Sequence, residues 1–411
     1  MSFHSKRLFT SVIAGSFFLS GLPSAASAQE ASTNASPPTE STAEFEIPSG
    51  DALVTVSDED IARAAELGNA DAAPYAAEHG ISLEEAVERL RVQEAVGSVS
   101  EELSLSLGED DAGTHIEHTP RFRVVVGTSG DDEDVELPAA LTALDVPVDI
   151  VEREHSLADI QRDRESVQAE LEDEGIEFDS YENVIDNNAV IEVVGESSAA
   201  EEIASEAAPL SLSGPPTVAI RSVDEPAETE SGGLALTSCT AGFVVVRSGT
   251  RLLSTAAHCS NTQRLVTSDI GLGYVTGTYG NYYDAQVHSA PGVNLRNRIY
   301  TGTGSTNYRD ITSRRSRADI SVGDYVCKRG KTTEYGCSYV ASKTVRTSAV
   351  PSSHATFIGM QSHITDGGDS GGPWFNGYTA IGIHHGRVGS MSVFMSVSFL
   401  GGATGASILT S

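Results

Sequence analysis

The sequence predicts two halves of different fold class, an α and α+β front half followed by an all-β back half. Charge is divided unevenly, with a formal charge of −39 in residues 1–230 and +7 in residues 231–411. Ten of the 12 tyrosines lie in the back half, where short apolar runs alternate with Gly, Ser, Asn and Thr. Many short strands separated by such turns indicate a sandwich or a barrel. The charge difference suggests that the halves bind each other, or that one is discarded.

The composition excludes several classes of function. A formal charge of −32 over 411 residues repels nucleic acid and anionic membrane surfaces, so neither is expected as a partner. Beyond the N-terminus the sequence has no uninterrupted run of 18 apolar residues, so no further spanning helix is expected. We expect a monomer that uses no cofactor and no metal ion.

The first 28 residues are typical of a secretory signal peptide. Lys6 and Arg7 form a positive segment, residues 8–22 are apolar, and a small-x-small cleavage signal ends at Ala28. An uncleaved anchor is the alternative. Export predicts a secreted, extracellular protein in an oxidising compartment, where the four cysteines are expected to form two disulfides.

Three further segments make up the front half. Residues 29–44 predict a flexible spacer because they are rich in Ser, Thr, Ala and Pro. Residues 45–112 predict a helical subdomain, with helix caps at Ser57 and Ser82. Residues 113–222 predict an α+β subdomain without a phosphate-binding loop or a metal-ligating cluster. Its expected strands are 121–127, 146–151 and 188–194, and its expected helices are 137–144 and 157–171.

A linker over residues 223–234 is marked by Pro226 and by the acidic run that ends at Glu230. Such composition indicates an exposed processing site, here after Glu230. The domain over residues 231–411 follows, and helix patterns are almost absent from it. Its expected strands are 243–247, 322–326, 337–340, 380–383 and 393–399.

The segment from Gly367 to Pro373 (GGDSGGP) carries the clearest chemical pattern. Ser370 is flanked by glycines, so its hydroxyl sits on a tight turn with no neighbouring side chain to shield it. Backbone N–H groups of that turn can point into the same space and form an oxyanion site. An ordinary Gly-rich turn is the alternative for a bare pattern of this kind.

A serine nucleophile needs a base and an acid that orients the base. His258 in Thr255–Cys259 (TAAHC) supplies the base, beside a cysteine that can hold it in place. Asp284 is the candidate acid, because a carboxylate within an aromatic and apolar run must be paired. Asp269 and Asp310 are alternatives in polar, turn-like segments.

These motifs resemble the chymotrypsin-type serine endopeptidases, most closely the bacterial branch of streptogrisins and alpha-lytic protease. The matches are Thr255–Cys259, Asp284, Gly368–Pro373 and the Cys-bounded segment Val326–Cys337. The resemblance covers about two fifths of the chain. It implies two six-stranded antiparallel β-barrels with the catalytic triad between them. The front half resembles a pro-region that assists folding, inhibits the enzyme and is removed on maturation.

The resemblance also assigns roles to residues. It implies disulfides Cys239–Cys259 and Cys327–Cys337, a Ser370 nucleophile, a His258 base, an Asp284 orienting acid, and an oxyanion hole from the N–H groups of Gly368 and Ser370. Asp369 is expected to pair with Lys328 or Arg329. Two departures are visible. Asp366 stands where the family usually has a cysteine, and His385 stands where a serine commonly contacts the triad acid, which suggests a looser triad.

Three side chains suggest which bond is cut. Thr365, His384 and Arg387 place a hydroxyl, an imidazole and a guanidinium around the expected specificity pocket, a set that suits a carboxylate. They resemble the pocket of the glutamyl endopeptidases, which implies a preference for Glu before the cut. A satisfied strand histidine with a solvated arginine is the alternative.

The sequence therefore predicts a secreted serine endopeptidase zymogen that acts on protein or peptide substrates. A preference for medium apolar residues, or a catalytically silent binding relative, are the alternatives. Self-processing after Glu230 would free a chain of the size that a double barrel needs.

Overall fold

The computed structural model describes residues 57–131, 135–194, 198–207, 217–223, 234–266, 269–301 and 308–410. The expected signal peptide with Ala28, the spacer and most of the linker with Glu230 lie outside the described residues. The described residues belong to one compact unit that runs from Gly50 to Ser411. Within the described ranges, no helix has both the length and the hydropathy that crossing a bilayer requires.

Three helices open the described chain: α1 (Asp58–Glu66), α2 (Ala72–His79) and α3 (Leu83–Leu107). The expected caps are present, because the hydroxyls of Ser57 and Ser82 accept the N–H groups of Asp60 and Glu85, each at 3.1 Å. The C-terminal half of α3 packs its apolar face on a small sheet. That sheet contains β1 (Asp111–Glu117), β2 (Arg123–Thr128) and β3 (Val148–Glu152), with α4 (Ala139–Thr142) beside it.

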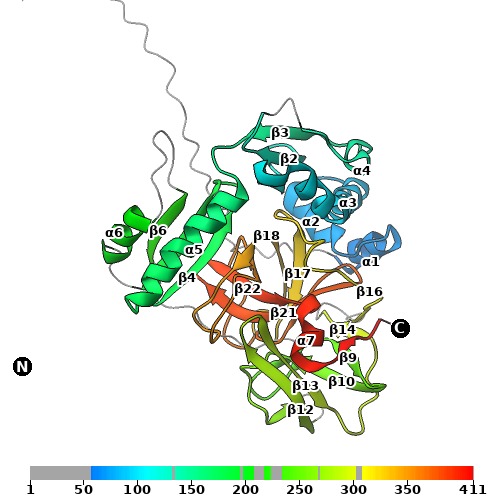
Figure 1. The fold of residues 1–411 in the computed structure, drawn as a ribbon. Helices are drawn as coiled ribbons and strands as arrows, with labels where there is room; N and C mark the ends of the chain where they lie inside the picture. The colour runs from blue at the N-terminus through cyan, green and yellow to red at the C-terminus, as the bar shows by residue number, and fades with distance from the viewer. Residues whose placement is uncertain are drawn as a thin grey trace, which may run out of the picture. The chain divides into compact units, whose positions relative to one another are not determined.

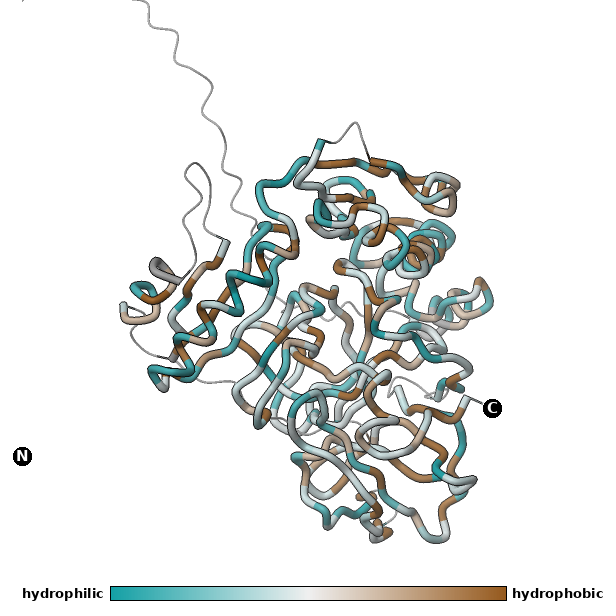
Figure 2. Tube along the Cα trace, viewed as in Figure 1, coloured by the Kyte–Doolittle hydropathy of each residue, from teal (hydrophilic) through white to brown (hydrophobic). Residues whose placement is uncertain are grey.

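A second small sheet follows in the order β4–β5–β6, where β4 is Phe178–Asn183, β5 is Asn188–Val194 and β6 is Val218–Val223. Two helices, α5 (Leu157–Asp173) and α6 (Ser198–Ala207), pack together against it (Figure 1). Helix α5 is largely hydrophilic in Figure 2, and three of its apolar side chains, Ile160, Val167 and Leu171, are buried. In the front half, a small apolar core therefore lies between each sheet and its helices, and the polar faces of the helices point outward.

The back half begins with a six-stranded antiparallel sheet in the order β11–β12–β13–β10–β9–β23. The bounds are β9 Val244–Arg247, β10 Thr250–Thr255, β11 Gln263–Leu265, β12 Ile270–Gly280, β13 Tyr283–Ser289 and β23 Ser407–Ile408. Short strands β7 (Leu234–Ala235) and β8 (Thr240–Ala241) precede β9 and pair with each other, and α7 (Leu400–Thr404) precedes β23.

The second sheet closes on itself. Its strands follow the order β21–β20–β17–β18–β19–β22, and β22 pairs back onto β21, which completes a six-stranded antiparallel barrel. The bounds are β17 Tyr325–Arg329, β18 Tyr335–Val345, β19 Phe357–Met360, β20 Pro373–Asn376, β21 Thr379–Val388 and β22 Met391–Ser396. The short strand β16 (Ser313–Arg314) adds to β21 in parallel, and β14 (Arg298–Tyr300) pairs with β15 (Tyr308–Asp310).

Two expected strands have different bounds in the structure. The strand expected over 322–326 begins only at Tyr325, because Gly323 has a φ of +89° and the chain turns there. The strand expected over 393–399 ends at Ser396, whose hydroxyl accepts the N–H of Ser398 at 3.3 Å and starts a single 3-10 turn. In the front half, β1, β4, β6 and α6 are additional to the expected elements.

Front and back halves share an apolar core, in which Tyr75 lies against Tyr325, and they are also joined by backbone hydrogen bonds and ion pairs. In β4, Ser180 exchanges two backbone hydrogen bonds with Arg346 of the back half, at 3.2 and 2.7 Å. Three ion pairs join the halves within the described residues, and in each the acid belongs to the front half and the arginine to the back half. They are Asp71–Arg309, Glu94–Arg315 and Glu172–Arg346. These ion pairs therefore follow the charge division of the sequence.

Candidate active site

The three expected catalytic side chains come from both sheets of the back half. His258 lies in the loop after β10, Asp284 is the second residue of β13, and Ser370 lies in the turn before β20. Strands β10 and β13 pair antiparallel, with Thr255 opposite Gln286. The end of β10 therefore delivers the loop with His258 directly beside the start of β13, where Asp284 stands.

Asp284 holds His258 through both carboxylate oxygens. Oδ2 lies 2.7 Å from Nδ1 of His258, while Oδ1 accepts the backbone N–H groups of Ala257 at 2.7 Å and His258 at 3.0 Å. The Asp284 side chain is 0% exposed and that of His258 is 12% exposed. Burial opposes ionisation, but the nearby His258 and hydrogen bonds from His258 and His385 hold the pKa of Asp284 well below its usual range.

His385, which stands where the family commonly has a serine, also contacts Asp284. Its Nδ1 also lies 2.7 Å from Oδ2 of Asp284, and both side chains are 0% exposed. The rings of His258 and His385 meet edge-on, with centroids 5.6 Å apart and an interplanar angle of 84°. The histidine in the serine position therefore makes its own hydrogen bond to the triad acid.

Ser370 lies in a turn whose glycines are required by geometry. Its Oγ donates to the carbonyl oxygen of His385 at 2.9 Å, and the residue is fully buried. Gly368 has a φ of +122° and Gly371 a φ of +83°. A Cβ on Gly371 would lie 2.1 Å from Oγ1 of Thr255, so only glycine fits there. The amides of Gly368 and Ser370 have no hydrogen-bond partner among the residues that the structure describes.

Asp369 connects the turn around Ser370 to the segment from Lys328 to Thr333. Its Oδ2 pairs with Nζ of Lys328 at 3.2 Å, and the two side chains are 1% and 2% exposed. Oδ1 accepts the N–H groups of Thr332 at 3.0 Å and Thr333 at 3.2 Å. Burial works against its charge, but Lys328 and the hydroxyl of Thr333 lower the pKa of Asp369. Of the two expected cations, Lys328 makes the pair. Arg329 instead lies over the ring of Tyr300 at 5.2 Å.

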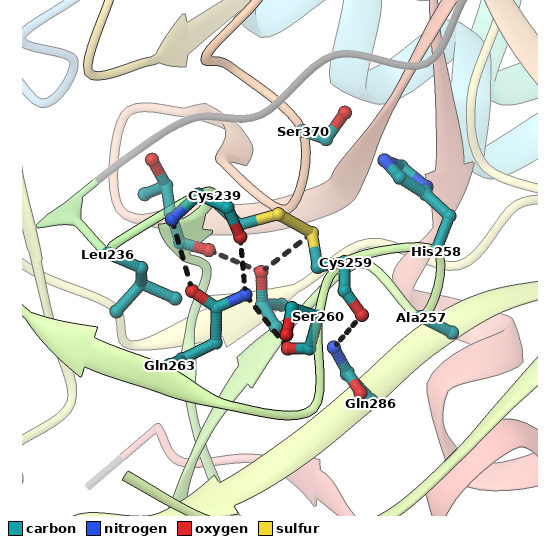
Figure 3. Close-up of a disulfide and its surroundings, with 12 residues drawn as sticks. Leu236, Cys239, Ala257, His258, Cys259, Ser260, Gln263, Gln286 and Ser370 are labelled. Carbon is teal, nitrogen blue, oxygen red and sulfur yellow. Dashed lines mark hydrogen bonds between the residues drawn. A yellow bond between two sulfur atoms is a disulfide. The ribbon is translucent and has the colours of Figure 1, made fainter. Parts of the chain in front are cut away.

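Two disulfides brace the site, with the pairing that the resemblance implies. Cys239–Cys259 adjoins His258, and Figure 3 shows the disulfide beside that histidine, with Ser370 on a separate loop nearby. Gln286 of β13 donates to the carbonyl of Cys259 at 3.1 Å and so ties the same loop to the sheet. The second disulfide, Cys327–Cys337, joins paired residues of β17 and β18.

Two of the three expected pocket residues are tied to polar partners that sequence reasoning missed. Oγ1 of Thr365 lies 2.7 Å from Oγ of Ser392, which also accepts the N–H of Ile364 at 3.0 Å. Ser392 is also the strand partner of Arg387 in the pairing of β21 with β22. No local sequence signal marks Ser392, because its neighbours are set by the pairing of β21 with β22.

His384 is held differently from its neighbour His385. The indole Nε1–H of Trp374 donates to Nδ1 of His384 at 3.3 Å, and both side chains are buried. A neutral imidazole that accepts at Nδ1 carries its proton on Nε2. His384 is therefore fixed as an N–H donor at Nε2, a role that its sequence position alone did not reveal.

Within the described ranges, one group of side chains has metal-ligand spacing: His258, Asp284 and His385, whose ligand atoms lie within 4.8 Å of one another. Both imidazole Nδ1 atoms lie 2.7 Å from the same carboxylate oxygen, which is a hydrogen-bond distance. A zinc ion would need about 2.0–2.2 Å to each ligand and would displace both hydrogen bonds. The geometry fits hydrogen bonding better than a cation.

Comparison with known proteins places this geometry in a family. Glutamyl endopeptidase 2 of Streptomyces griseus is 33% identical over 155 residues, which are 37% of this chain and 79% of that protein.

The chain belongs to the chymotrypsin-type serine endopeptidases.

Two further members of this family align over shorter shares of their length. Serine protease 1 of Streptomyces fradiae is 33% identical over 159 residues, 37% of this chain and 42% of that protein. Streptogrisin-A of Streptomyces griseus is 31% identical over 191 residues, 44% of this chain and 61% of that protein. The chain thus spans less than two thirds of these two endopeptidases.

No protein-family model matches the chain. A solved glutamic acid-specific serine protease, described as using a histidine triad in substrate binding, superposes with a TM-score of 0.37 and 25% identity. The superposition covers 43% of this chain and 98% of that endopeptidase.

Proposed function

We propose that the chain is a secreted zymogen of a serine endopeptidase that hydrolyses peptide bonds with Ser370, His258 and Asp284 through an acyl-enzyme. The observation that carries this proposal is the hydrogen bond of 2.7 Å between Nδ1 of His258 and the buried Asp284. It holds the imidazole in the tautomer whose Nε2 accepts a proton. The Gly-rich turn around Ser370 supplies the nucleophile.

In this mechanism Ser370 rotates from the carbonyl of His385 toward Nε2 of His258, which removes the hydroxyl proton as Oγ attacks the substrate carbonyl. Asp284 keeps the imidazole aligned and stabilises the imidazolium. The amides of Gly368 and Ser370 donate to the oxyanion, each worth about 3–4 kcal/mol in the transition state. His258 then protonates the leaving amine, and water hydrolyses the acyl-enzyme by the same steps.

Active-site labelling tests this reaction. The purified secreted protein is treated with a fluorophosphonate and digested, and the labelled peptide is identified by mass spectrometry. Label on Ser370 is expected in the wild type and is lost in His258→Ala, while the control Ser289→Ala, a partly buried serine in the same domain, keeps it. A wild type that takes no label and cleaves no peptide would identify the chain as a silent binding relative.

We further propose that the enzyme prefers Glu before the cut. Trp374 leaves His384 with its proton on Nε2, where it can donate to a substrate carboxylate. Since Ser392 accepts the N–H of Ile364, its own proton is available to Thr365, whose hydroxyl can then donate to the same ligand. Arg387 adds positive charge. One relative in this family carries the name glutamyl endopeptidase 2.

Matched substrates test this preference. Peptides with Glu, Gln or Leu before the cut are compared, because Gln has the shape of Glu without its charge. Thr365→Val and His384→Leu are each expected to lower kcat/KM for Glu about tenfold to a hundredfold, the loss of one charge-assisted hydrogen bond. His288→Leu, a buried histidine elsewhere in the domain, is the control. If the wild-type enzyme instead cleaves a peptide library mainly after Leu, the alternative preference for medium apolar residues would be favoured.

The front half is proposed to act as a pro-region that stays on the back half until it is removed. Support comes from the three acid–arginine pairs between the halves and from the backbone pairing of Ser180 with Arg346. We propose that self-processing follows Glu230, so that the pocket preference and the linker sequence have one explanation.

N-terminal sequencing of the secreted mature protein tests the processing site. Ser231 is expected as the first residue, and Glu230→Gln is expected to slow or shift the cut, whereas Glu228→Gln leaves it in place. A wild-type N-terminus far from Ser231 would remove self-processing from the account and leave the endopeptidase assignment intact.

A further inference from the structure

The carboxylate of Asp284 accepts four hydrogen bonds. Oδ1 accepts two backbone N–H groups, from Ala257 and His258. Oδ2 faces the Nδ1 atoms of His258 and His385, each at 2.7 Å. An ionised carboxylate offers about four acceptor sites, so this one is saturated. Two imidazoles share a single oxygen, and only one of them can serve as the base for Ser370.

The surroundings of His385 are unfavourable for a histidine with no function. Its side chain is 0% exposed and lies against the ring of Phe357, with centroids 5.0 Å apart. Its Nε2 is buried and has no hydrogen-bond partner in the described part of the chain. An unpaired buried acceptor destabilises a protein, so burial alone does not explain an imidazole at this position.

Backbone and side chain of His385 reach two different members of the proposed machinery. Its carbonyl oxygen accepts the hydroxyl of Ser370 at 2.9 Å, and its imidazole faces Asp284. His385 lies in β21 at a register shift, between the pairs that His384 and Gly386 make with β22, so the pairing of both neighbours holds its backbone and its side chain in place. The resting nucleophile and the orienting acid therefore both contact the same residue.

We propose that His385 is a positioning residue of the peptidase: it donates its Nδ1–H to Oδ2 of Asp284 and so fixes the carboxylate against which His258 is aligned. This inference rests on the proposed function. A neutral Nδ1–H donor leaves the carboxylate charged and uses the lone pair of Oδ2 that His258 leaves free. Rotation of the carboxylate would break that bond, so the acid keeps one orientation through the reaction.

Loss of this donor has two separable consequences. The carboxylate gains freedom to rotate, so His258 is aligned less often and kcat falls while KM changes little. The charge on Oδ2 is then directed to His258 alone, which favours the imidazolium. The acidic limb of the pH profile of kcat/KM therefore moves to higher pH.

Three variants test the inference. Each is produced as the full chain and assayed after maturation. His385→Leu removes the donor and is expected to lower kcat about tenfold to a hundredfold, well short of the about 10⁴-fold loss known for a wrong imidazole tautomer. It is also expected to shift the acidic limb upward by about half a pH unit. His385→Asn, whose amide can donate from nearly the same place, is expected to restore most of kcat and the wild-type limb. His288→Leu, another buried histidine of the domain, is expected to leave both unchanged.

A measurement without turnover covers the case in which His385→Leu fails to fold or mature. Full-length protein with ¹⁵N-labelled histidine and the change Ser370→Ala is expected to show two strongly deshielded imidazole N–H signals, one from each histidine on Asp284. Adding His385→Asn is expected to remove one signal and shift the other. A second signal that is absent from the start, or a His258 signal that His385→Asn leaves unmoved, would overturn the inference.

The kinetic outcomes separate this inference from the proposed function. A wild type that takes no fluorophosphonate label would overturn the proposed function, and with it the positioning role. A labelled, active wild type whose kcat and pH profile are matched by His385→Leu would overturn the positioning role alone.

Discussion

Replacing Lys328 with methionine removes the cation that pairs with Asp369 in the turn that carries Ser370. The pair spans 3.2 Å and its side chains are 2% and 1% exposed, so the remaining carboxylate would be buried without its counter-charge. Breaking a buried ion pair from one side costs about 3–5 kcal/mol. Three backbone N–H groups, of Thr332, Thr333 and Asp366, still donate to Asp369, so the expected loss lies at the lower end of this range, at about 3 kcal/mol.

Thermal unfolding of the full chain measures this loss, with Ser370→Ala present in every variant to prevent self-digestion. A loss of about 3 kcal/mol corresponds to a midpoint lowered by about 6–12 °C for a domain of this size. Lys331→Met, in the same hairpin, is the control and is expected to change the midpoint by less than about 3 °C. Adding Asp369→Asn to Lys328→Met removes the unpaired charge and is expected to recover part of the loss. A Lys328→Met midpoint equal to that of the control would refute the reasoning.

Three more outcomes are expected. Gly371→Ala abolishes peptide hydrolysis and lowers the unfolding midpoint, because the new Cβ would lie 2.1 Å from Oγ1 of Thr255; normal activity would contradict the turn geometry. Asp71→Asn weakens the contact between the halves by about 3 kcal/mol or more, since it breaks a buried pair with an arginine. Gel filtration of the processed protein should show that the front half dissociates earlier. A front half that stays bound as in the wild type would count against this. Burial lowers the pKa of His79 to about 4 and that of His118 to about 3 at the contact between the halves. The two histidines therefore stabilise this contact fully above about pH 6.5, and the stabilisation is lost as the pH falls through these pKa values. Release of the front half that does not increase between pH 7 and pH 4 would refute this.

Local patterns predicted the parts of the molecule that depend on local geometry. The turn around Ser370 needs glycines whatever surrounds it, and a cysteine after His258 marks a loop held by a disulfide. Helix caps at Ser57 and Ser82 were predictable for the same reason, because the bonds that they make span three residues.

Features that depend on sheet register could not be predicted in this way. His385 of β21 and Asp284 of β13 belong to different sheets and meet across 101 residues of sequence. Ser392 reaches Thr365 through the pairing of β22 with β21, and Trp374 reaches His384 through the pairing of β20 with β21. No short pattern encodes these contacts.

Strands of the front half illustrate the same limit. The sequence of β4 (FDSYEN) is largely polar, yet its residues are mostly buried, because β4 pairs with β5 and contacts Arg346 of the back half. Strand β6 lies next to a Pro-rich stretch, and its pairing with β5 is parallel and non-local. Tertiary pairing overrides weak local propensity at both places.

The central claim is that Ser370 is a nucleophile activated by His258, and stoichiometric labelling of the secreted protein by a fluorophosphonate tests it most directly. One added phosphonyl group per mature chain is expected, located on Ser370 and absent in His258→Ala. An unlabelled Ser370 in a folded protein whose two disulfides are intact would contradict it.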